Sequence, residues 1–382
     1  MKGRTLAILL IVLAVLTGLV FVVFMQRSPR EGKRDLGTLL LKNFPANDIA
    51  SVAILDAGDE GVELVRREAR WVVKNRFGYP ADFQKISDFV RKLRDAKIGR
   101  SFEATKGALA RLHLKDPTDR NVPEKEKGTA IIFSDAKGKT LVRMLMGLPM
   151  KGGQGGVFPE GQYVLLGDGK TVYLVNKQFE GLAKNPSGWL KKDLIDVKAA
   201  DVREVVCLDA DGKTVRFAFR RPTKGKDPEQ VNPQPAGEKI KRTSLNRLIG
   251  GLSTLRIEDV EDPAKKEVRR DLENSARLEF RLFNGMIYDL YPGEKYNKDA
   301  GTCYLKVGVR YERPASLKRA PEKPAKKSES GKKPENSDKS MEQKAVDLNK
   351  KLSPWIYKIP QWKHDALITN FEALLEKEKK KK

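Results

Sequence analysis

The chain is poor in the residues that most often build metal sites and redox centres. Its 382 residues include two cysteines and two histidines. These are Cys207, Cys303, His113 and His364. None of them has the spacing of a metal-ligand pattern, and no other metal-binding motif accompanies them. Each cysteine lies in a strand-like run, which leaves two alternatives open: one disulfide between neighbouring strands, or two buried free thiols.

Acidic residues are also outnumbered. The chain has 51 Asp and Glu against 75 Lys and Arg, which gives a formal net charge of +24. Such a balance favours anionic neighbours, whether phospholipid head groups, cell-wall polymer or nucleic acid. Aromatic residues follow the apolar faces of the predicted elements instead of alternating with Arg and Lys, which disfavours nucleic acid. We therefore interpret four tryptophans as core residues, namely Trp71, Trp189, Trp355 and Trp362.

A phosphate-binding loop is missing, although the tripeptide Gly-Lys-Thr occurs three times. The copies are at 138–140, 169–171 and 212–214. Such a loop needs another glycine five positions earlier and a helix directly afterwards. The residues at the earlier position are Phe133, Val164 and Cys207. The segments that follow are β-branched or aromatic and roughly alternating, so each copy is predicted to be a turn between two antiparallel strands.

One long hydrophobic run is present, at residues 5–24. It carries no charge, and at 1.5 Å per residue it is long enough to cross about 30 Å of hydrocarbon. No small-x-small cleavage site follows, so we predict an uncleaved transmembrane anchor and then a linker over 25–47. The flanking charges are Lys2 and Arg4 before the run, and Arg27, Arg30, Lys33 and Arg34 after it. The positive-inside rule alone therefore leaves the orientation open.

The remainder of the chain is internally repeated. The segment DIASVAILDA at 48–57 corresponds to DVREVVCLDA at 201–210, and AIIFSDAKGKTLVRMLMG at 130–147 corresponds to RLEFRLFNGMIYDLYPG at 277–293. The correspondence continues from QYVLL at 162–166 to CYLKV at 303–307, and from 171–194 to 355–378. Frequent hairpins favour antiparallel sheets, so the predicted class is α+β. We expect repeat 1 over 48–198 and repeat 2 over 199–378, after the one transmembrane helix.

Each repeat is predicted to contain one amphipathic helix after its first strands, and further helices at its end. In the first repeat the apolar residues are Phe83, Ile86, Phe89, Val90 and Leu93, with Asp82 as the N-cap. In the second they are Leu245, Leu248, Ile249, Leu252 and Leu255, with Thr243 or Ser244 as the cap. This spacing places each set on one face of a helix.

The second repeat has two insertions that lack hydrophobic periodicity. One is the Pro/Gly-rich segment 222–239, and the other is the Lys-rich segment 313–351. Both are predicted to be exposed or disordered, as is the basic tail 379–382. For 313–351 two interpretations stay open: a mobile surface loop, or a polybasic tether for anionic lipid or polymer.

No catalytic constellation is evident. Serine and cysteine residues lack a nucleophile-elbow context, and no pair of carboxylates stands out as an acid/base couple. Asp56 and Asp209 occupy equivalent turns, where Asp commonly bonds the local backbone. His113 is interpreted as a helix-end or partly exposed residue, and KGGQGG at 151–156 as a long hairpin loop. We therefore predict no catalytic, cofactor-binding or metal-binding residues, no cofactor and no enzymatic activity.

Several diffuse signatures together resemble proteins of the domain of unknown function 4340 (DUF4340) family. They are FPANDIASVAILD at 44–56, RWVVK with Trp71, YPAD before the first helix, and VYLVNKQF and WLKKDLI near the end of the first repeat. The resemblance implies a single-pass protein of the bacterial inner membrane with its body outside the cytoplasm. It also implies an accessory role beside ABC transport components, of the kind associated with gliding motility.

The sequence and the resemblance lead to two functional hypotheses. The first is a non-enzymatic, membrane-anchored extracytoplasmic module that assists an ABC-type transport or envelope complex. Its partners would be ABC transporter subunits or other envelope proteins. The second is a module that binds anionic cell-envelope polymer or lipid through its basic surface.

Overall fold

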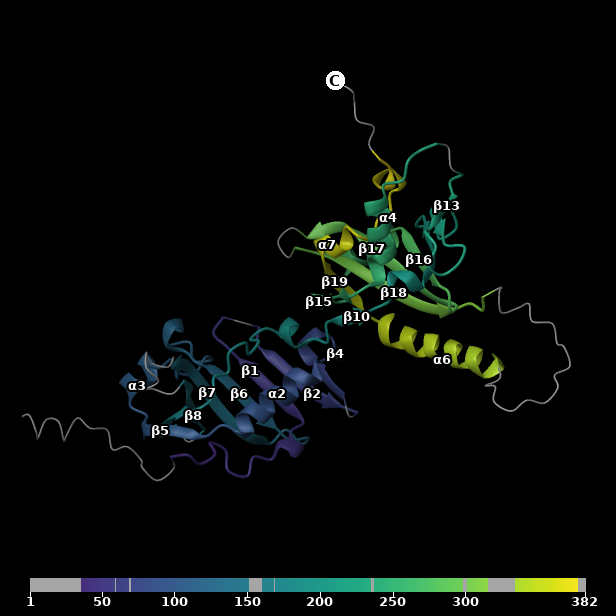
Figure 1. Ribbon diagram of the computed structural model, residues 1–382. Coiled ribbons are helices and arrows are strands. Elements are labelled where there is room, and N and C mark those ends of the chain that lie inside the picture. Colours follow the sequence, from purple (N-terminus) through teal and green to yellow (C-terminus); the bar gives the residue numbers. More distant parts are fainter. Residues whose placement is uncertain are drawn as a thin grey trace, which may run out of the picture. The chain divides into compact units, whose positions relative to one another are not determined.

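The computed structural model describes residues 36–58, 60–68, 70–150, 160–167, 169–234, 237–297, 301–314 and 334–376, with only the backbone described for 294–297 and 334–338. The chain divides into two compact units, at Leu190 and Lys191 (Figure 1). Within the described ranges, no helix has both the length and the apolar character needed to cross a membrane. The predicted anchor 5–24, residues 25–35 of the linker, the KGGQGG segment and the basic tail lie outside the described residues.

The first unit is built on a nine-stranded sheet with the order β4-β3-β2-β1-β6-β7-β8-β9-β5. Its strands are β1 Ser51–Leu55, β2 Val62–Arg67, β3 Arg70–Val73, β4 Tyr79–Pro80, β5 Ile98–Glu103, β6 Thr129–Ser134, β7 Thr140–Met150, β8 Gly161–Leu166 and β9 Thr171–Val175. Its helices are α2 Phe83–Arg94 and α3 Lys106–Arg111, with 3-10 turns η1 Ala46–Asp48, η2 Lys74–Arg76, η3 Glu124–Glu126 and η4 Pro186–Trp189.

The second unit has an eight-stranded sheet with the order β13-β12-β11-β16-β17-β18-β19-β15, and a two-stranded sheet of β10 and β14. Its strands are β10 Asp193–Ile195, β11 Val202–Leu208, β12 Val215–Arg220, β13 Glu229–Asn232, β14 Leu255–Arg256, β15 Asp259–Glu261, β16 Arg277–Leu282, β17 Met286–Asn297, β18 Thr302–Tyr311 and β19 Ile356–Pro360. Its helices are α4 Arg242–Ile249, α5 Lys266–Glu273, α6 Pro334–Leu352 and α7 Gln361–His364, with 3-10 turns η5 Ala199–Asp201, η6 Gly250–Leu252 and η8 Phe371–Leu374.

The two large sheets confirm the predicted duplication and the antiparallel α+β class. The order β3-β2-β1-β6-β7-β8-β9-β5 of the first corresponds strand for strand to the whole of the second. The register agrees as well, because Val52 pairs with Phe133 in one unit and Val205 pairs with Phe280 in the other. Equivalent positions in the two repeats can therefore be compared residue by residue.

The three Gly-Lys-Thr segments form the predicted hairpin turns. They join β6 to β7, β8 to β9 and β11 to β12, all of which are antiparallel pairs. The glycines have φ angles of 80° at Gly138, 65° at Gly169 and 66° at Gly212. This left-handed conformation is accessible to glycine at little cost, which explains why the tripeptide recurs at turns.

Each repeat begins with a short segment that forms backbone hydrogen bonds with the residues following its amphipathic helix, α2 or α4. In the second unit this segment is β10, which pairs with β14. In the first unit, Gly37 N donates to Ile98 O and Leu40 N donates to Ala96 O, both at 2.8 Å. The structural repeats thus include residues that precede the sequence match at 48 and 201.

The first amphipathic helix follows its sequence pattern closely. Asp82 caps α2 by accepting hydrogen bonds from Gln84 N at 3.1 Å and Lys85 N at 3.3 Å. Ile86, Phe89 and Leu93 are buried. Phe83 is 63% exposed, so it lies outside the buried part of this face. At 100° per residue Phe83 lies at the border of the stripe centred on Ile86 and Leu93.

The predicted cap of the second helix was also wrong. Helix α4 begins at Arg242, and its N-cap Lys241 makes no side-chain capping bond. The start is fixed instead by an isolated β-bridge to the end of η8, because Ile240 bridges Leu375 and Lys241 N donates to Leu374 O at 2.7 Å. This anchoring places Thr243 and Ser244 inside the first turn.

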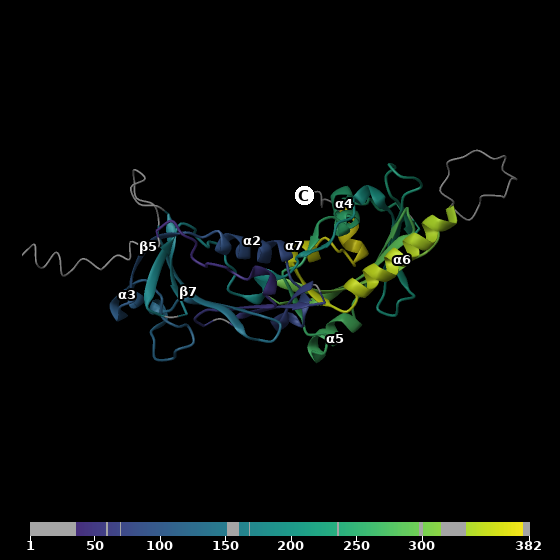
Figure 2. The same ribbon diagram turned by 90° about the horizontal axis from the view of Figure 1, so that it is seen from below.

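Both insertions are mostly exposed where they are described, as predicted, but each contains one ordered element that was not predicted. Residues 229–232 form β13, which pairs with β12 in the place that β3 takes in the first unit. Residues 334–352 form α6, which packs along β18 (Figures 1 and 2). Asn349 Oδ1 accepts a hydrogen bond from Val309 N at 2.9 Å. Since β19 pairs only with residues 302–306 of β18, α6 satisfies part of the edge that β19 leaves open.

The tryptophans differ from the prediction that all four lie in the core. Trp189 is 3% exposed, which confirms the prediction for that residue. Trp362 is 66% exposed, because α7 is a single turn and its neighbour Lys363 faces inward, donating to Ser253 O at 2.6 Å. Trp71 and Trp355 are half-buried. The predicted helices at the repeat ends are also reduced to short turns, η4, α7 and η8.

Candidate functional site

One face of the sheet differs chemically between the two repeats, and this difference defines the candidate site. In the first unit, four residues form a row across β6, β7, β8 and β9 on the face away from α2. They are Ala130, Leu145, Leu165 and Val172, and all are buried in one apolar cluster with Leu112 and Leu114. The loop that carries α3 therefore closes this part of the first sheet with a dry core.

The equivalent row in the second unit has polar side chains at three of its four positions. It consists of Arg277, Tyr291, Lys306 and Ile356, as the register of β16 to β19 places them. These residues line a cavity of about 790 Å³. Figure 2 shows α4 and α7 on one side of this unit and α5 on the other. The sheet, α5, the Asp209–Gly212 turn and the Ser353–Ile356 segment enclose what we call the basic cavity.

Three cations line the basic cavity, namely Arg269, Arg277 and Lys306. Arg269, from α5, donates from Nε to Pro263 O at 3.0 Å. Among the described residues, no carboxylate lies within ion-pair distance of Arg269 or Lys306. Two acidic residues also line the cavity: Asp209, which pairs with Arg216 at 2.5 Å, and Glu273. The cavity therefore offers both anion-binding groups and hydrogen-bond acceptors.

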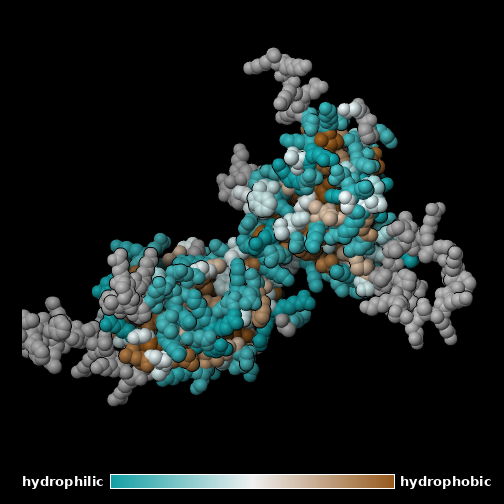
Figure 3. Space-filling view, in the orientation of Figure 1, coloured by the Kyte–Doolittle hydropathy of each residue, from teal (hydrophilic) through white to brown (hydrophobic). Residues whose placement is uncertain are grey.

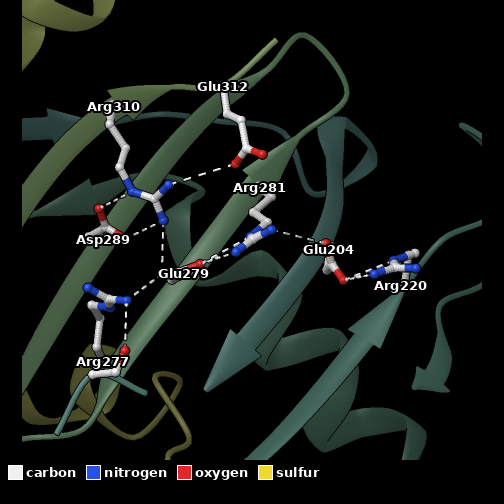
Figure 4. A network of polar contacts seen from close by, with 9 residues as sticks. Glu204, Arg220, Arg277, Glu279, Arg281, Asp289, Arg310 and Glu312 are labelled. Atoms are coloured by element: carbon white, nitrogen blue, oxygen red, sulfur yellow. Dashed lines mark hydrogen bonds and ion pairs between the residues drawn. The ribbon is translucent and has the colours of Figure 1, made fainter. Parts of the chain in front are cut away.

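A charge network on the same face of the sheet holds Arg277 in place. Glu279 is 2% exposed, and its carboxylate forms ion pairs with three arginines (Figure 4). The distances to its carboxylate are 2.7 Å from Arg277, 2.6 Å from Arg281 and 2.9 Å from Arg310. Burial raises the pKa of Glu279, but the three arginines outweigh it and leave the pKa below its usual value.

The network extends across five neighbouring strands. The Asp289 carboxylate pairs with Arg310 Nε at 3.0 Å, and the Glu204 carboxylate pairs with Arg220 at 2.6 Å. Burial raises the pKa of Asp289 more than Arg310 lowers it. Four arginines face four carboxylates in all, namely Arg220, Arg277, Arg281 and Arg310 against Glu204, Glu279, Asp289 and Glu312. The carboxylates are engaged by arginine, so the arrangement is a scaffold that fixes side-chain positions.

Of the residues singled out in the sequence, Asp209 and Trp355 line the basic cavity, whereas Asp56 and His113 belong to the first unit and serve local structure. Asp56 accepts from Thr129 Oγ1 at 2.7 Å and pairs with Lys184 at 2.9 Å. Asp56 and Asp209 thus bind side chains of other residues, where the sequence predicted bonds to the local backbone. His113 follows α3 with φ 53° and is half-buried, as predicted. The described part of the chain contains no group of three or more His, Cys, Asp or Glu placed to hold a metal ion.

The two cysteines are free and buried, which resolves the alternatives left by the sequence. Strands β16 and β17 separate β11, which carries Cys207, from β18, which carries Cys303. Three strand spacings amount to about 14 Å, beyond the reach of a disulfide. Burial raises the pKa of the Cys207 thiol to about 12 and that of Cys303 to about 11.

The cavity residues were missed in the sequence, although a signal for them was present. Aligning the repeats sets Ala130 against Arg277 and Leu165 against Lys306. A charged residue at a position that is apolar in the sister repeat indicates a different environment on that face of the sheet. The alternation within a single strand does not carry this signal, because an exposed strand face is also charged.

Comparison with known proteins gives one match. The family model for the domain of unknown function DUF4340 matches residues 71–274, which is more than half of the chain. This range runs from β3 of the first unit to the end of α5 in the second. No curated protein and no solved structure matches the chain. The protein therefore belongs to the DUF4340 family.

Proposed function

We propose that this protein acts by binding, and that its second unit holds an anionic group of a cell-envelope polymer or lipid in the basic cavity. The observation that carries the proposal is the replacement of a packed apolar row by Arg277, Tyr291 and Lys306 around about 790 Å³ of open space. A stable sheet does not require this replacement, since the first repeat closes the same position with Leu145 and Leu165.

The electrostatics support an anionic ligand. Arg277 presents a planar fork whose position Glu279 fixes, with Nη2 and Oε1 2.7 Å apart. Lys306 and Arg269 bring positive charge to the same cavity, and neither forms an ion pair with a carboxylate of the described residues. A bound phosphate or carboxylate would gain charge-assisted hydrogen bonds at a site partly shielded from water, where charges interact more strongly than on an open surface.

The test compares two sources of the anionic group, using the full-length protein in detergent micelles or reconstituted bilayers. One arm measures binding to vesicles of phosphatidylglycerol against phosphatidylcholine, and the other measures binding to soluble polyanions such as polyphosphate. We expect binding in at least one arm, weakening as salt is raised from low to physiological ionic strength. Salt-insensitive binding would contradict the proposal, and so would a failure of every anionic probe to bind, acidic oligosaccharides included.

A matched pair of variants locates the binding. Lys306→Leu installs the residue of the first repeat, while Lys137→Leu makes the same change on the exposed turn between β6 and β7. Loss of one charge-assisted hydrogen bond costs about 1.5–3 kcal/mol, which weakens binding roughly tenfold or more. We expect this loss for Lys306→Leu alone. Equal effects of the two variants would place binding on the general basic surface.

A second candidate function is that of a membrane-anchored, extracytoplasmic accessory to an ABC-type transport or envelope complex. The uncharged run 5–24 and membership of the DUF4340 family support it. The experiment is cross-linked affinity purification of the full-length protein from native membranes, followed by mass spectrometry. Recovery of permease or ATPase subunits is the expected result. Recovery of envelope polymer or lipid without such subunits would leave cavity binding as the function.

A further inference from the structure

We infer that the ligand of the basic cavity is an acidic glycan, a saccharide chain whose sugar units carry carboxylate or phosphate groups. This inference rests on the proposed function and narrows the ligand class. It comes from three features of the cavity: the spacing of its cations, the acidic residues beside them, and an aromatic ring at one end.

The spacing of the cations favours an extended ligand. Arg277 and Lys306 lie in one row of the sheet with Tyr291 between them. Two strand spacings separate their backbones by roughly 10 Å, and a third cation, Arg269, enters from α5. A cavity of about 790 Å³ also exceeds what a single phosphate or carboxylate fills. A ligand with acid groups on successive units matches this row.

The acidic residues disfavour a ligand made only of anionic groups. Asp209 and Glu273 line the same cavity, so a continuous polyanion would place negative charge beside theirs. Hydroxyl groups between the acid groups would instead donate hydrogen bonds to these carboxylates and to Ser275 or Ser353. Sugar rings supply such hydroxyls. Acyl chains supply no hydroxyl groups. Packing them against the charged lining would remove water from those charges without replacing its hydrogen bonds, which is unfavourable.

The aromatic ring completes the site. Trp355 lines the cavity at the start of β19, and its indole Nε1 donates to Lys351 O at 3.0 Å. This bond satisfies the polar edge of the ring, and the residue contributes aromatic surface to the lining of the cavity. Tyr291 adds a second ring with a hydroxyl group. Aromatic surface next to charged and hydrogen-bonding groups suits the mixed polar and apolar faces of a sugar.

The experiment measures calorimetric binding of the full-length protein in detergent to three probes. These are an oligogalacturonate, a neutral malto-oligosaccharide of the same length, and inorganic polyphosphate of similar charge. We expect the oligogalacturonate to bind at least about tenfold more tightly than either of the others. Trp355→Ala should weaken it several-fold and Trp355→Phe much less, while Trp362→Ala, at a 66% exposed site, should change nothing.

The outcomes separate this inference from the proposed function. If polyphosphate or anionic vesicles bind as tightly as the oligogalacturonate, and Lys306→Leu weakens that binding, the cavity binds anions but the glycan inference is overturned. If no anionic probe binds, both are overturned. Thermal unfolding of each Trp355 variant checks its fold. If Trp355→Ala is unfolded, the affinity of Trp355→Phe for the oligogalacturonate tests the role of the ring instead.

Discussion

Lys306 of the second repeat occupies the sheet position that Leu165 occupies in the first. Leu165 pairs with Leu145 and Val172, and Lys306 pairs with Tyr291 and Ile356 in the same register. Leu165 is 6% exposed, while Lys306 is exposed at the cavity. Hydrophilic side chains dominate the visible surface of both units, so exposed charge is not in itself unusual here (Figure 3). What distinguishes Lys306 is that the equivalent position of the first repeat holds a buried leucine, so the fold does not need a charged residue there.

Exchanging the two residue types should have opposite consequences. Leu165→Lys would bury an ammonium group in an apolar cluster and remove its packing, so we expect a loss of more than about 3 kcal/mol in the free energy of unfolding. Lys306→Leu should stay within about 0.5 kcal/mol of wild type, since the side chain is exposed. Urea unfolding of the full-length protein in detergent, followed by circular dichroism, measures both. Comparable losses for the two variants would refute the assigned difference between the repeats.

The charge network should make stability depend on pH in acid. The pKa of Glu279 is lowered in the folded state, so its stabilisation is present above its usual value of 4.5 and is lost as pH falls through the lower folded pKa. Asp289 acts with the opposite sign: its raised pKa imposes a cost above the folded pKa that disappears in acid. We expect Glu279→Gln to lose about 3–5 kcal/mol at pH 7 and to lose less further stability on acidification than wild type.

The control for this prediction is Glu342→Gln on the exposed side of α6. It should leave both the stability at pH 7 and its dependence on pH nearly unchanged. Chemical denaturation at intervals between pH 7 and pH 3 provides the comparison. If Glu279→Gln and Glu342→Gln follow parallel curves, the arginines around Glu279 do not stabilise its ionised form.

Capping should distinguish the two amphipathic helices. Asp82→Ala removes the side chain that accepts from Gln84 N and Lys85 N, and should cost about 1 kcal/mol of stability. Thr243→Ala, which the sequence pattern alone would rank as an equal loss, should be neutral or slightly stabilising because Thr243 lies within α4. Thermal unfolding of the two variants tests this contrast. A loss at Thr243 as large as at Asp82 would restore the cap inferred from sequence.

The sequence was sufficient for features that depend on local chemistry. Glycine at a positive φ, apolar spacing in α2 and alternation in paired strands all act within a few residues, so the hairpins and the helix could be predicted. The duplication was also visible, because Phe133 and Phe280 stand at matching points of matching segments. The frequent hairpins indicate the antiparallel class without any knowledge of the packing.

Features that depend on distant partners could not be predicted from each segment alone. The start of α4 follows from a backbone bond to Leu374, more than a hundred residues away in sequence. Helix α6 is stabilised by contact with β18, not by its weakly patterned sequence. The charge network unites β12, β11, β16, β17 and β18, which an alternating pattern of Arg and Glu in any one strand does not reveal. The basic cavity required the same tertiary information.

The two thiols should be inert in the folded protein. Burial raises the pKa of Cys207 to about 12 and that of Cys303 to about 11, so almost no thiolate exists at neutral pH, and access is restricted as well. We expect iodoacetamide at pH 7.5 to modify neither cysteine in the native full-length protein. In denaturant without reductant, mass spectrometry should find both modified, since the thiols are free. Rapid labelling of the native protein would contradict their burial, and labelling that requires a reductant would show that they pair after all.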